Sequence, residues 1–221
     1  MFRVITIERE YGCGAGAIAA QLAQRLGWKL WDHLLTEEVA RIANVTSSVV
    51  KRCDEKLDSA LHRFAKAFWR GSYERSSSLG SQIFDTDCMM VMMQDIMNRI
   101  AKEGTAVVVG RGAPFFLREE RDAFHVFLYA PRSEKIRRVV ANGRTSAEAD
   151  ELVEMVDRER IAFIKHYFNA DWPTRSLYHL MVNTAMGSEA VIKTILDTMH
   201  LIEGNPKATD YEPAKAPAVQ R

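Results

Sequence analysis

The chain has 221 residues and 47% of them are hydrophobic, so it is long enough for one α/β domain with an insertion and apolar enough for a core. Its formal net charge of +1 argues against a nucleic acid polymer as partner, so any anion site must be local. The three cysteines, Cys13, Cys53 and Cys88, lack CxxC spacing, and we expect neither a zinc site nor disulfides. Since no apolar run is long enough to span a membrane, we expect a cytoplasmic protein without membrane contacts.

Apolar runs with β-branched residues alternate with stretches of helical periodicity along the chain. Strands are predicted over residues 4–7, 28–32, 105–110, 124–130 and 180–184. Helices are predicted over residues 17–26, 87–102, 134–140, 146–168 and from 188 onward, the long one with room for a single break. Ser133 and Ser188 are the expected N-caps of their helices, and Gly27 the expected stop of the first. The five methionines of 87–102 are interpreted as adaptable core.

Alternating strands and helices predict a three-layer α/β fold, with a doubly wound parallel sheet covered by helices on both faces. Such sheets bind ligands at the carboxyl ends of their strands. We expect a single domain over residues 1–203. The Pro-, Ala- and charge-rich residues 204–221 are expected to be a disordered tail.

The first predicted strand runs into a glycine-rich turn, whose candidate phosphate-binding residues are Gly12, Cys13, Gly14, Ala15, Gly16 and Ala17. Backbone N–H groups of such a turn, followed by a helix N-terminus, can bind an anion. The turn fits the Walker A pattern poorly, because Ala15 stands where the lysine belongs and Arg9 where the first glycine belongs. Two other readings stay open: a tight turn that packs the helix close to the strand, and a dinucleotide fingerprint with Ala17 at its third position.

Several segments, in this order and spacing, resemble the cytidylate kinase-like family, a branch of the P-loop nucleoside monophosphate kinases. They are IEREYGCGAGAIA, WDHLL, VVVGRGAPFFL, VFLYAPRSEKIRRV and VDRERIAFIKHYFNADW. The resemblance implies a P-loop NTPase-like, five-stranded parallel sheet, a helical acceptor-binding insertion at about 36–103 and a lid at about 142–175. It also implies ATP and Mg²⁺ as cofactors and a turn without the Walker lysine. The chain departs from the family at Gly16 and Ala17, where an Arg and a Glu are frequent.

Four charged side chains are the main candidates around the turn. Arg9 lies inside it and is a candidate to replace the lysine at the donor phosphates; the alternative is a surface pair with Glu8 or Glu10. By resemblance, Arg111 in VVVGRG binds the acceptor phosphate, and Arg158 and Arg160 in DRER close over the phosphates. For the last two, the alternative is a solvated helix with ion pairs to nearby acids.

The acids near the turn have weaker assignments. Asp32, at the end of the second predicted strand, resembles the residue that opens the acceptor site in this family, and otherwise caps the next helix. Glu8 is a candidate base or magnesium-shell residue, and Gly112 is expected to leave room for a ligand. No set of side chains with metal-ligand spacing is apparent, so no direct metal ligand is assigned.

These residues favour a nucleotide kinase that transfers the γ-phosphoryl group of ATP to a nucleoside monophosphate, with CMP or dCMP as the default acceptor. The alternative is a regulatory protein that binds a nucleotide or another anion without turning it over. A dehydrogenase is the weakest hypothesis, because no hydride-transfer constellation accompanies Asp32. The expected partner is a small nucleotide, and the protein is expected to be a monomer or a homodimer.

Overall fold

The computed structural model describes residues 1–32 and 86–205 of the chain. Its strands are β1 (Val4–Arg9), β2 (Lys29–Trp31), β3 (Ala106–Val109), β4 (Ala123–Tyr129) and β5 (Leu180–Asn183). All paired neighbours are parallel, in the order β2-β3-β1-β4-β5. The predicted five-stranded parallel α/β sheet is confirmed.

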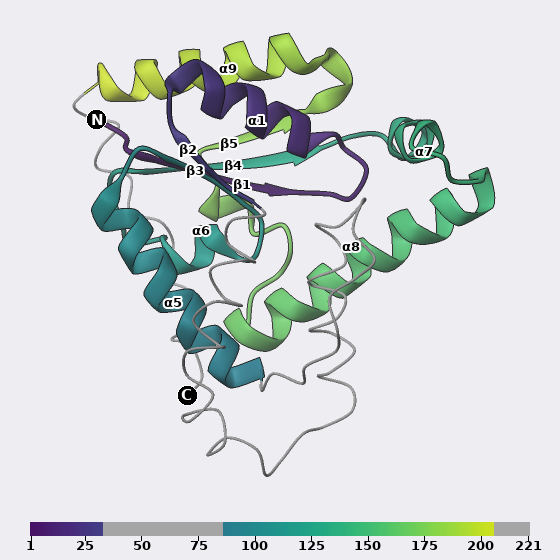
Figure 1. The fold of residues 1–221 in the computed structure, drawn as a ribbon, viewed down its shortest axis with the longest axis horizontal. Helices are drawn as coiled ribbons and strands as arrows, with labels where there is room; N and C mark the ends of the chain where they lie inside the picture. Colours follow the sequence, from purple (N-terminus) through teal and green to yellow (C-terminus); the bar gives the residue numbers. More distant parts are fainter. Residues whose placement is uncertain (33–85, 206–221) are drawn as a thin grey trace.

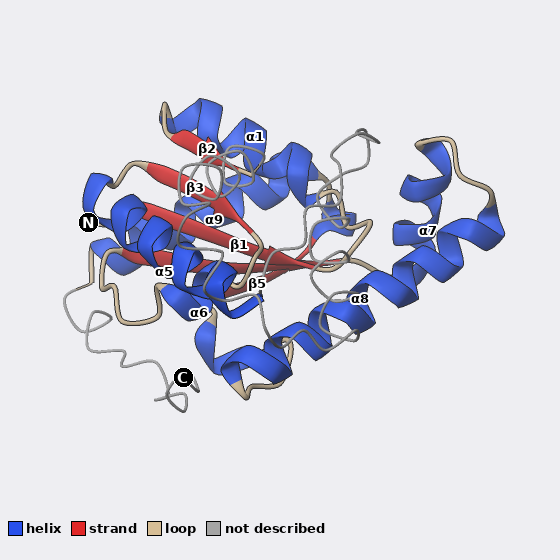
Figure 2. Ribbon diagram, turned by 60° about the horizontal axis from the view of Figure 1, so that its bottom comes forward, coloured by secondary structure: helices blue, strands red, loops and turns tan. Residues whose placement is uncertain are grey.

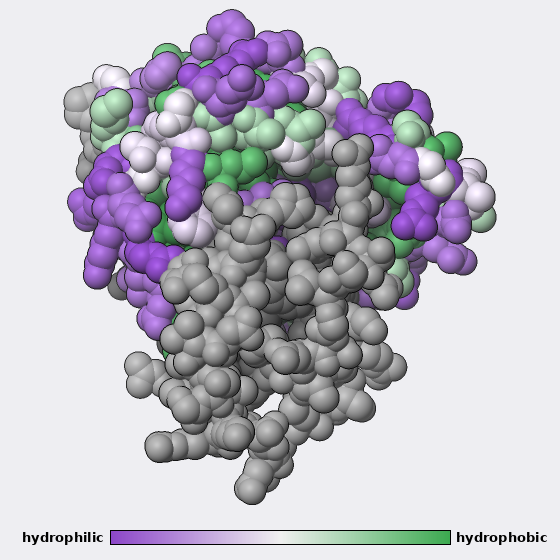
Figure 3. All heavy atoms as spheres, in the orientation of Figure 1, coloured by the Kyte–Doolittle hydropathy of each residue, from purple (hydrophilic) through white to green (hydrophobic). Residues whose placement is uncertain are grey.

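Helices cover both faces of this sheet (Figures 1 and 2). The described helices are α1 (Ala15–Leu26), α5 (Thr86–Glu103), α6 (Ala113–Phe116), α7 (Arg132–Ala141), α8 (Ser146–Phe168) and α9 (Ser188–Glu203), with short 3₁₀ turns at Arg175–Leu177 and Thr184–Met186. Helices α1 and α9 share one apolar core with the sheet, while α5, α6 and the last turns of α8 pack on the other face. The outward side of α9 is largely hydrophilic, as expected for a helix that covers a sheet (Figure 3).

The alternation of side chains along β1 divides them between these two cores. Ile5 and Ile7 face α1 and α9, whereas Val4 faces α5. Thr6 and Glu8 therefore lie on the α5, α6 and α8 side, and both are buried. Because β1 is the central strand, its carboxyl end brings the turn after it next to the ends of β3 and β4.

Helix ends differ from the sequence predictions by one or two residues. α1 begins at Ala15 and not Ala17, and Gly27 ends it in a left-handed conformation as predicted. Ser133 lies inside α7, whose N-cap is Pro131, and Ser188 is the first residue of α9, whose N-cap is Gly187. Thr145 instead starts α8 with a capping box, and this helix runs unbroken to Phe168.

The methionine-rich helix α5 packs on the sheet as predicted. Met93, Ile96, Met97 and Ile100 are buried against β1, β2 and β3. Most of the predicted insertion and nearly all of the predicted tail, residues 33–85 and 206–221, lie outside the described residues. No helix among the described residues has the length and apolarity that crossing a membrane requires.

Candidate functional site

The glycine turn joins β1 to α1 through two left-handed glycines, Gly12 (φ 75°) and Gly14 (φ 82°). The side chains of Cys13 and Ala15 point into the core and are 1% and 3% exposed. Ala15 therefore brings no charge to the turn, and its side chain is too short to contact a phosphate bound there. The first backbone N–H groups of α1 have no acceptor within the helix; that of Ala15 bonds the Cys13 sulfur, and those that follow it suit an anion.

Helix α7 lies directly against this turn. A Cβ atom on Gly12 would stand 3.0 Å from the carbonyl oxygen of Lys135 and 3.1 Å from a methyl group of Val139. At the other end of the turn, Arg138 donates hydrogen bonds to the carbonyl oxygen of Cys13 and, at 2.8 Å, to the hydroxyl of Thr184. The glycine at position 12 thus permits close packing of α7, so the turn serves helix packing as well as exposing N–H groups.

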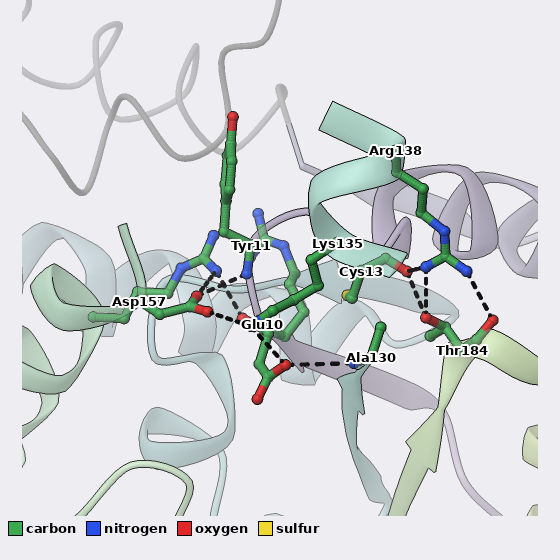
Figure 4. Close-up of polar contacts among 10 residues, drawn as sticks. Glu10, Tyr11, Cys13, Ala130, Lys135, Arg138, Asp157 and Thr184 are labelled. Atoms are coloured by element: carbon green, nitrogen blue, oxygen red, sulfur yellow. Dashed lines mark hydrogen bonds and ion pairs between the residues drawn. The ribbon is translucent and has the colours of Figure 1, made fainter. Parts of the chain in front are cut away.

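Lys135 is the cation that α7 places at the start of the turn (Figure 4). Its Nζ lies 3.0 Å from Oε2 of Glu10 and 3.0 Å from Oδ2 of Asp157. Its side chain is only 10% exposed. Burial opposes the charged form, but attraction to Asp157 and Glu10 outweighs it and raises the pKa of Lys135.

Asp157 ties α8 to the same turn. Its Oδ1 accepts a hydrogen bond from the backbone N–H of Tyr11 at 2.7 Å and another from Nη1 of Arg160 at 3.2 Å. Nη1 of Arg160 also donates to the carbonyl oxygen of Arg9 at 2.8 Å. The middle of α8, within the predicted lid, is therefore bonded to the turn in this structure.

The two candidate arginines of DRER have different surroundings. Arg160 has a side chain 15% exposed and lies against the turn. Arg158 has a side chain 73% exposed and pairs with Glu154 one helical turn away. Because they are two residues apart on a helix, they face different sides, and the structure brings only Arg160 to the site.

Arg9 is buried but extends toward the end of β3. A Cβ atom on Gly110 would lie 1.8 Å from Nη1 of Arg9, so the guanidinium occupies the space above that glycine. Burial raises the pKa of the Cys13 thiol and the charges of Arg9 and Arg160 oppose this, so both guanidinium groups also act on the glycine turn. Neither of the predicted surface pairs of Arg9 with Glu8 or Glu10 is among the ion pairs of the described residues.

Arg111 stands in a left-handed turn of three residues after β3. Its φ is 59°, between Gly110 (70°) and Gly112 (69°). The side chain is buried, so Arg111 is both strained and enclosed. The expectation that Gly112 leaves room for a ligand is wrong, because a Cβ atom there would meet the ring of Phe168 at 2.9 Å.

Glu8, at the end of β1, and Asp32, directly after β2, are acids at the same edge of the sheet. Glu8 is 3% exposed; burial raises its pKa, while the charges of Arg9 and Arg160 act in the opposite direction. Its Oε2 and the Oδ1 of Asp32 are buried without a hydrogen-bond partner among the described residues. Among residues 1–32 and 86–205, no group of three His, Cys, Asp or Glu side chains forms a metal site.

Sequence reasoning missed the two cations of α7. Lys135 and Arg138 are one helical turn apart in EKIRRVV, after the strand next to β1, and that spacing is the only local signal. Arg138 lies 125 positions along the chain from its partner Cys13 and 46 from its partner Thr184. Lys135 lies 22 positions from its partner Asp157. Such contacts become apparent only in the folded chain.

A family model described as "Cytidylate kinase-like family" matches residues 4–186. An uncharacterized protein from Eubacterium ventriosum has a similar structure, with a TM-score of 0.60 and 19% identity over 89% of this chain and 99% of that one. A gluconokinase from Sinorhizobium meliloti follows with a TM-score of 0.54 and 15% identity over 94% and 97%. None of the curated proteins compared matches the sequence. At these identities the solved structures establish the fold alone.

Proposed function

Since the chain belongs to the cytidylate kinase-like family, we propose that it is a kinase that transfers the γ-phosphoryl group of ATP to a nucleoside monophosphate. CMP and dCMP are the first acceptors to consider, because the family resemblance points to them. The observation that carries the proposal is the convergence of buried cations on the carboxyl edge of the sheet. These cations are Arg9, Arg111, Lys135 and Arg160.

Phosphoryl transfer requires in-line positioning of the phosphates and neutralisation of their charge, with little covalent chemistry by the protein. The four cations are accompanied by two paired carboxylates, Glu10 and Asp157, and by Glu8, whose pKa is raised by burial. With Arg138, which contacts Cys13, there are five cations, and with Asp32 there are four acids, so positive charge exceeds negative charge around the turn. An excess of this sign stabilises bound phosphates in a site that excludes water.

The cations divide between a donor and an acceptor side. The turn and α7 lie at β1 and β4, where Lys135 contacts Gly12 and Glu10, and Arg138 lies beside Gly14, the N-cap of α1. Arg9 lies over Gly110 at the end of β3 and Arg111 follows that glycine in the chain, which suits the phosphate of an acceptor nucleotide. Arg160 contacts Arg9 and the residues of the turn, so it is placed between the two sides.

Magnesium fits this arrangement as an ion that arrives with ATP. Mg²⁺ in kinases is held by one or two carboxylates, by phosphate oxygens and by water. The Oε2 of Glu8, buried and without a hydrogen-bond partner, is the described carboxylate oxygen best suited to the outer shell of such an ion. When bound, Mg²⁺ would neutralise charge on the donor phosphates.

The test is a transfer assay with the full chain, Mg²⁺ and ATP against CMP, dCMP, UMP and AMP, with ADP and the nucleoside diphosphate quantified together. The proposal predicts equal amounts of ADP and one diphosphate. Binding of ATP without product would contradict transfer and support the alternative, a regulatory nucleotide-binding protein. ADP formation without a diphosphate would indicate hydrolysis only.

A further inference from the structure

The glycine turn has no cation of its own at the position of the Walker lysine. Ala15 fills that position, and its methyl group is buried in the core. A triphosphate bound to backbone N–H groups alone would leave most of its charge uncompensated. A lysine or arginine from elsewhere in the chain must therefore reach the donor phosphates if the turn binds them.

Arg9 was the candidate suggested by the sequence, but its guanidinium covers Gly110 at the end of β3. Arg160 donates to the carbonyl oxygen of Arg9 and to Asp157, and it lies on the α8 side. Arg138 is engaged by Cys13 and by both oxygens of Thr184. Among residues 1–32 and 86–205, Lys135 is the lysine at the start of the turn, where Arg160 is the arginine beside it.

Two contacts fix the place of Lys135 beside the turn. Its backbone and Cβ lie against Gly12, within 3.0 and 3.2 Å of where a Cβ atom there would be. Its ammonium group lies 3.0 Å from the carboxylate of Glu10, which follows β1 directly and also accepts a hydrogen bond from the N–H of Ala130. The side chain therefore runs along the turn and ends above the carboxyl ends of β1 and β4.

Asp157 completes a clasp around the ammonium group at 3.0 Å, and it also binds the N–H of Tyr11. An ammonium group has three N–H donors, and Glu10 and Asp157 use two of them. The third donor remains for a phosphate oxygen. The two carboxylates also hold a flexible side chain in one geometry before any nucleotide binds, which lowers the entropic cost of binding.

We propose that Lys135 gives the donor phosphates the charge-assisted hydrogen bond that position 15 lacks, and that Glu10 and Asp157 position it. This inference rests on the proposed function. During transfer, the bond from the γ-phosphorus to the bridging oxygen breaks and ADP leaves with its electron pair, while an acceptor phosphate oxygen forms the new bond. Lys135 contributes charge and orientation and exchanges no proton.

The experiment separates binding of phosphates from binding of the nucleoside. ATP, adenosine and inorganic tripolyphosphate are titrated by calorimetry, in the presence of Mg²⁺, into four forms of the full chain. These are the wild type and the variants Lys135→Met, Lys135→Arg and Lys193→Met. Lys193 is the matched control, because it is exposed on α9 and, within the described part of the chain, pairs with Asp197 one turn along the same helix. Lys135→Met should lower the affinity for ATP and for tripolyphosphate by about tenfold or more, because one charge-assisted hydrogen bond is lost. Adenosine affinity should stay within about twofold, and Lys135→Arg should restore most of the loss.

Other results overturn the inference. If the affinity of Lys135→Met for ATP stays within about twofold of that of the wild type, the lysine serves only to link α7 to α8. Equal losses for ATP and adenosine would show a general distortion of the site. If Lys135→Met fails to fold, because two buried carboxylates lose their partner, the triple variant Lys135→Met, Glu10→Gln, Asp157→Asn removes those charges and is titrated in its place.

The outcome also distinguishes this inference from the proposed function. A wild-type protein that binds tripolyphosphate through Lys135 but forms no diphosphate would contradict transfer and keep the role of Lys135. If Lys135→Met transfers phosphate at the wild-type rate, the proposal of a kinase stands and the proposed role of Lys135 is refuted. A wild type that binds neither ATP nor tripolyphosphate would refute both.

Discussion

Replacement of Asp157 by alanine should strongly destabilise the fold. Its carboxylate accepts hydrogen bonds from Tyr11 and Arg160 and pairs with Lys135, and its side chain is 14% exposed. Alanine would leave three poorly solvated donors without their acceptor, two of them charged. Breaking a buried ion pair by removing one partner costs about 3–5 kcal/mol. For a chain of this length that corresponds to a drop in Tm of about 6 to 20 °C.

Thermal unfolding followed by circular dichroism measures this drop, and Asp150→Ala is its control. Asp150 also belongs to α8 and pairs with an arginine, Arg132, but its side chain is 49% exposed. An exposed pair contributes less than about 1 kcal/mol, so the control should melt close to wild type. Equal melting temperatures for the two variants would refute the clasp as a stabilising unit.

Three further predictions concern the turn, pH and the arginines. Gly12→Ala should lower the free energy of unfolding, measured with denaturant, by about 2 kcal/mol or more, because the left-handed φ of Gly12 and its contact with α7 both oppose a methyl group. Gly16 has open space around it, so Gly16→Ala should leave the free energy of unfolding unchanged or raise it. His125 is buried and burial lowers its pKa from 6.5 to about 3, so the folded state binds fewer protons than the unfolded chain between these values. The free energy of unfolding should therefore fall as pH drops below 6.5, by about 2 kcal/mol at pH 5. In His125→Gln this dependence on pH should disappear, and an equal dependence in the variant would show that His125 does not cause it. Arg160→Ala should raise the KM for the acceptor about tenfold or more, whereas Arg158→Ala should leave it unchanged; equal effects would contradict the placement of Arg160.

The strands were predictable because each is a short apolar run between turn signals. TAVVVG and FHVFLYA predicted β3 and β4 to within one or two residues. Helix starts were less predictable, because several residues near each start have capping side chains. Ser133 and Ser188 are both good caps by type, yet the backbone turns at Pro131 and Gly187.

The site was predictable in location and only partly in composition. The glycine pattern and the carboxyl-end rule indicated the edge of the sheet at which Arg160 contacts the turn. The sequence did not distinguish Arg160 from Arg158, because the face of α8 that meets the turn depends on how this helix docks. Lys135 escaped notice for a similar reason, since its partners come from the turn after β1 and from α8, and no local pattern encodes contacts with two distant segments.

The central claim is that a glycine turn without its lysine still supports phosphoryl transfer. Incubation of the full chain with ATP, Mg²⁺ and CMP or dCMP, with products separated by chromatography, tests it most directly. The account predicts that ADP and the matching cytidine diphosphate accumulate in equal amounts. No diphosphate from CMP, dCMP, UMP or AMP, with ATP bound to the folded protein, would contradict it.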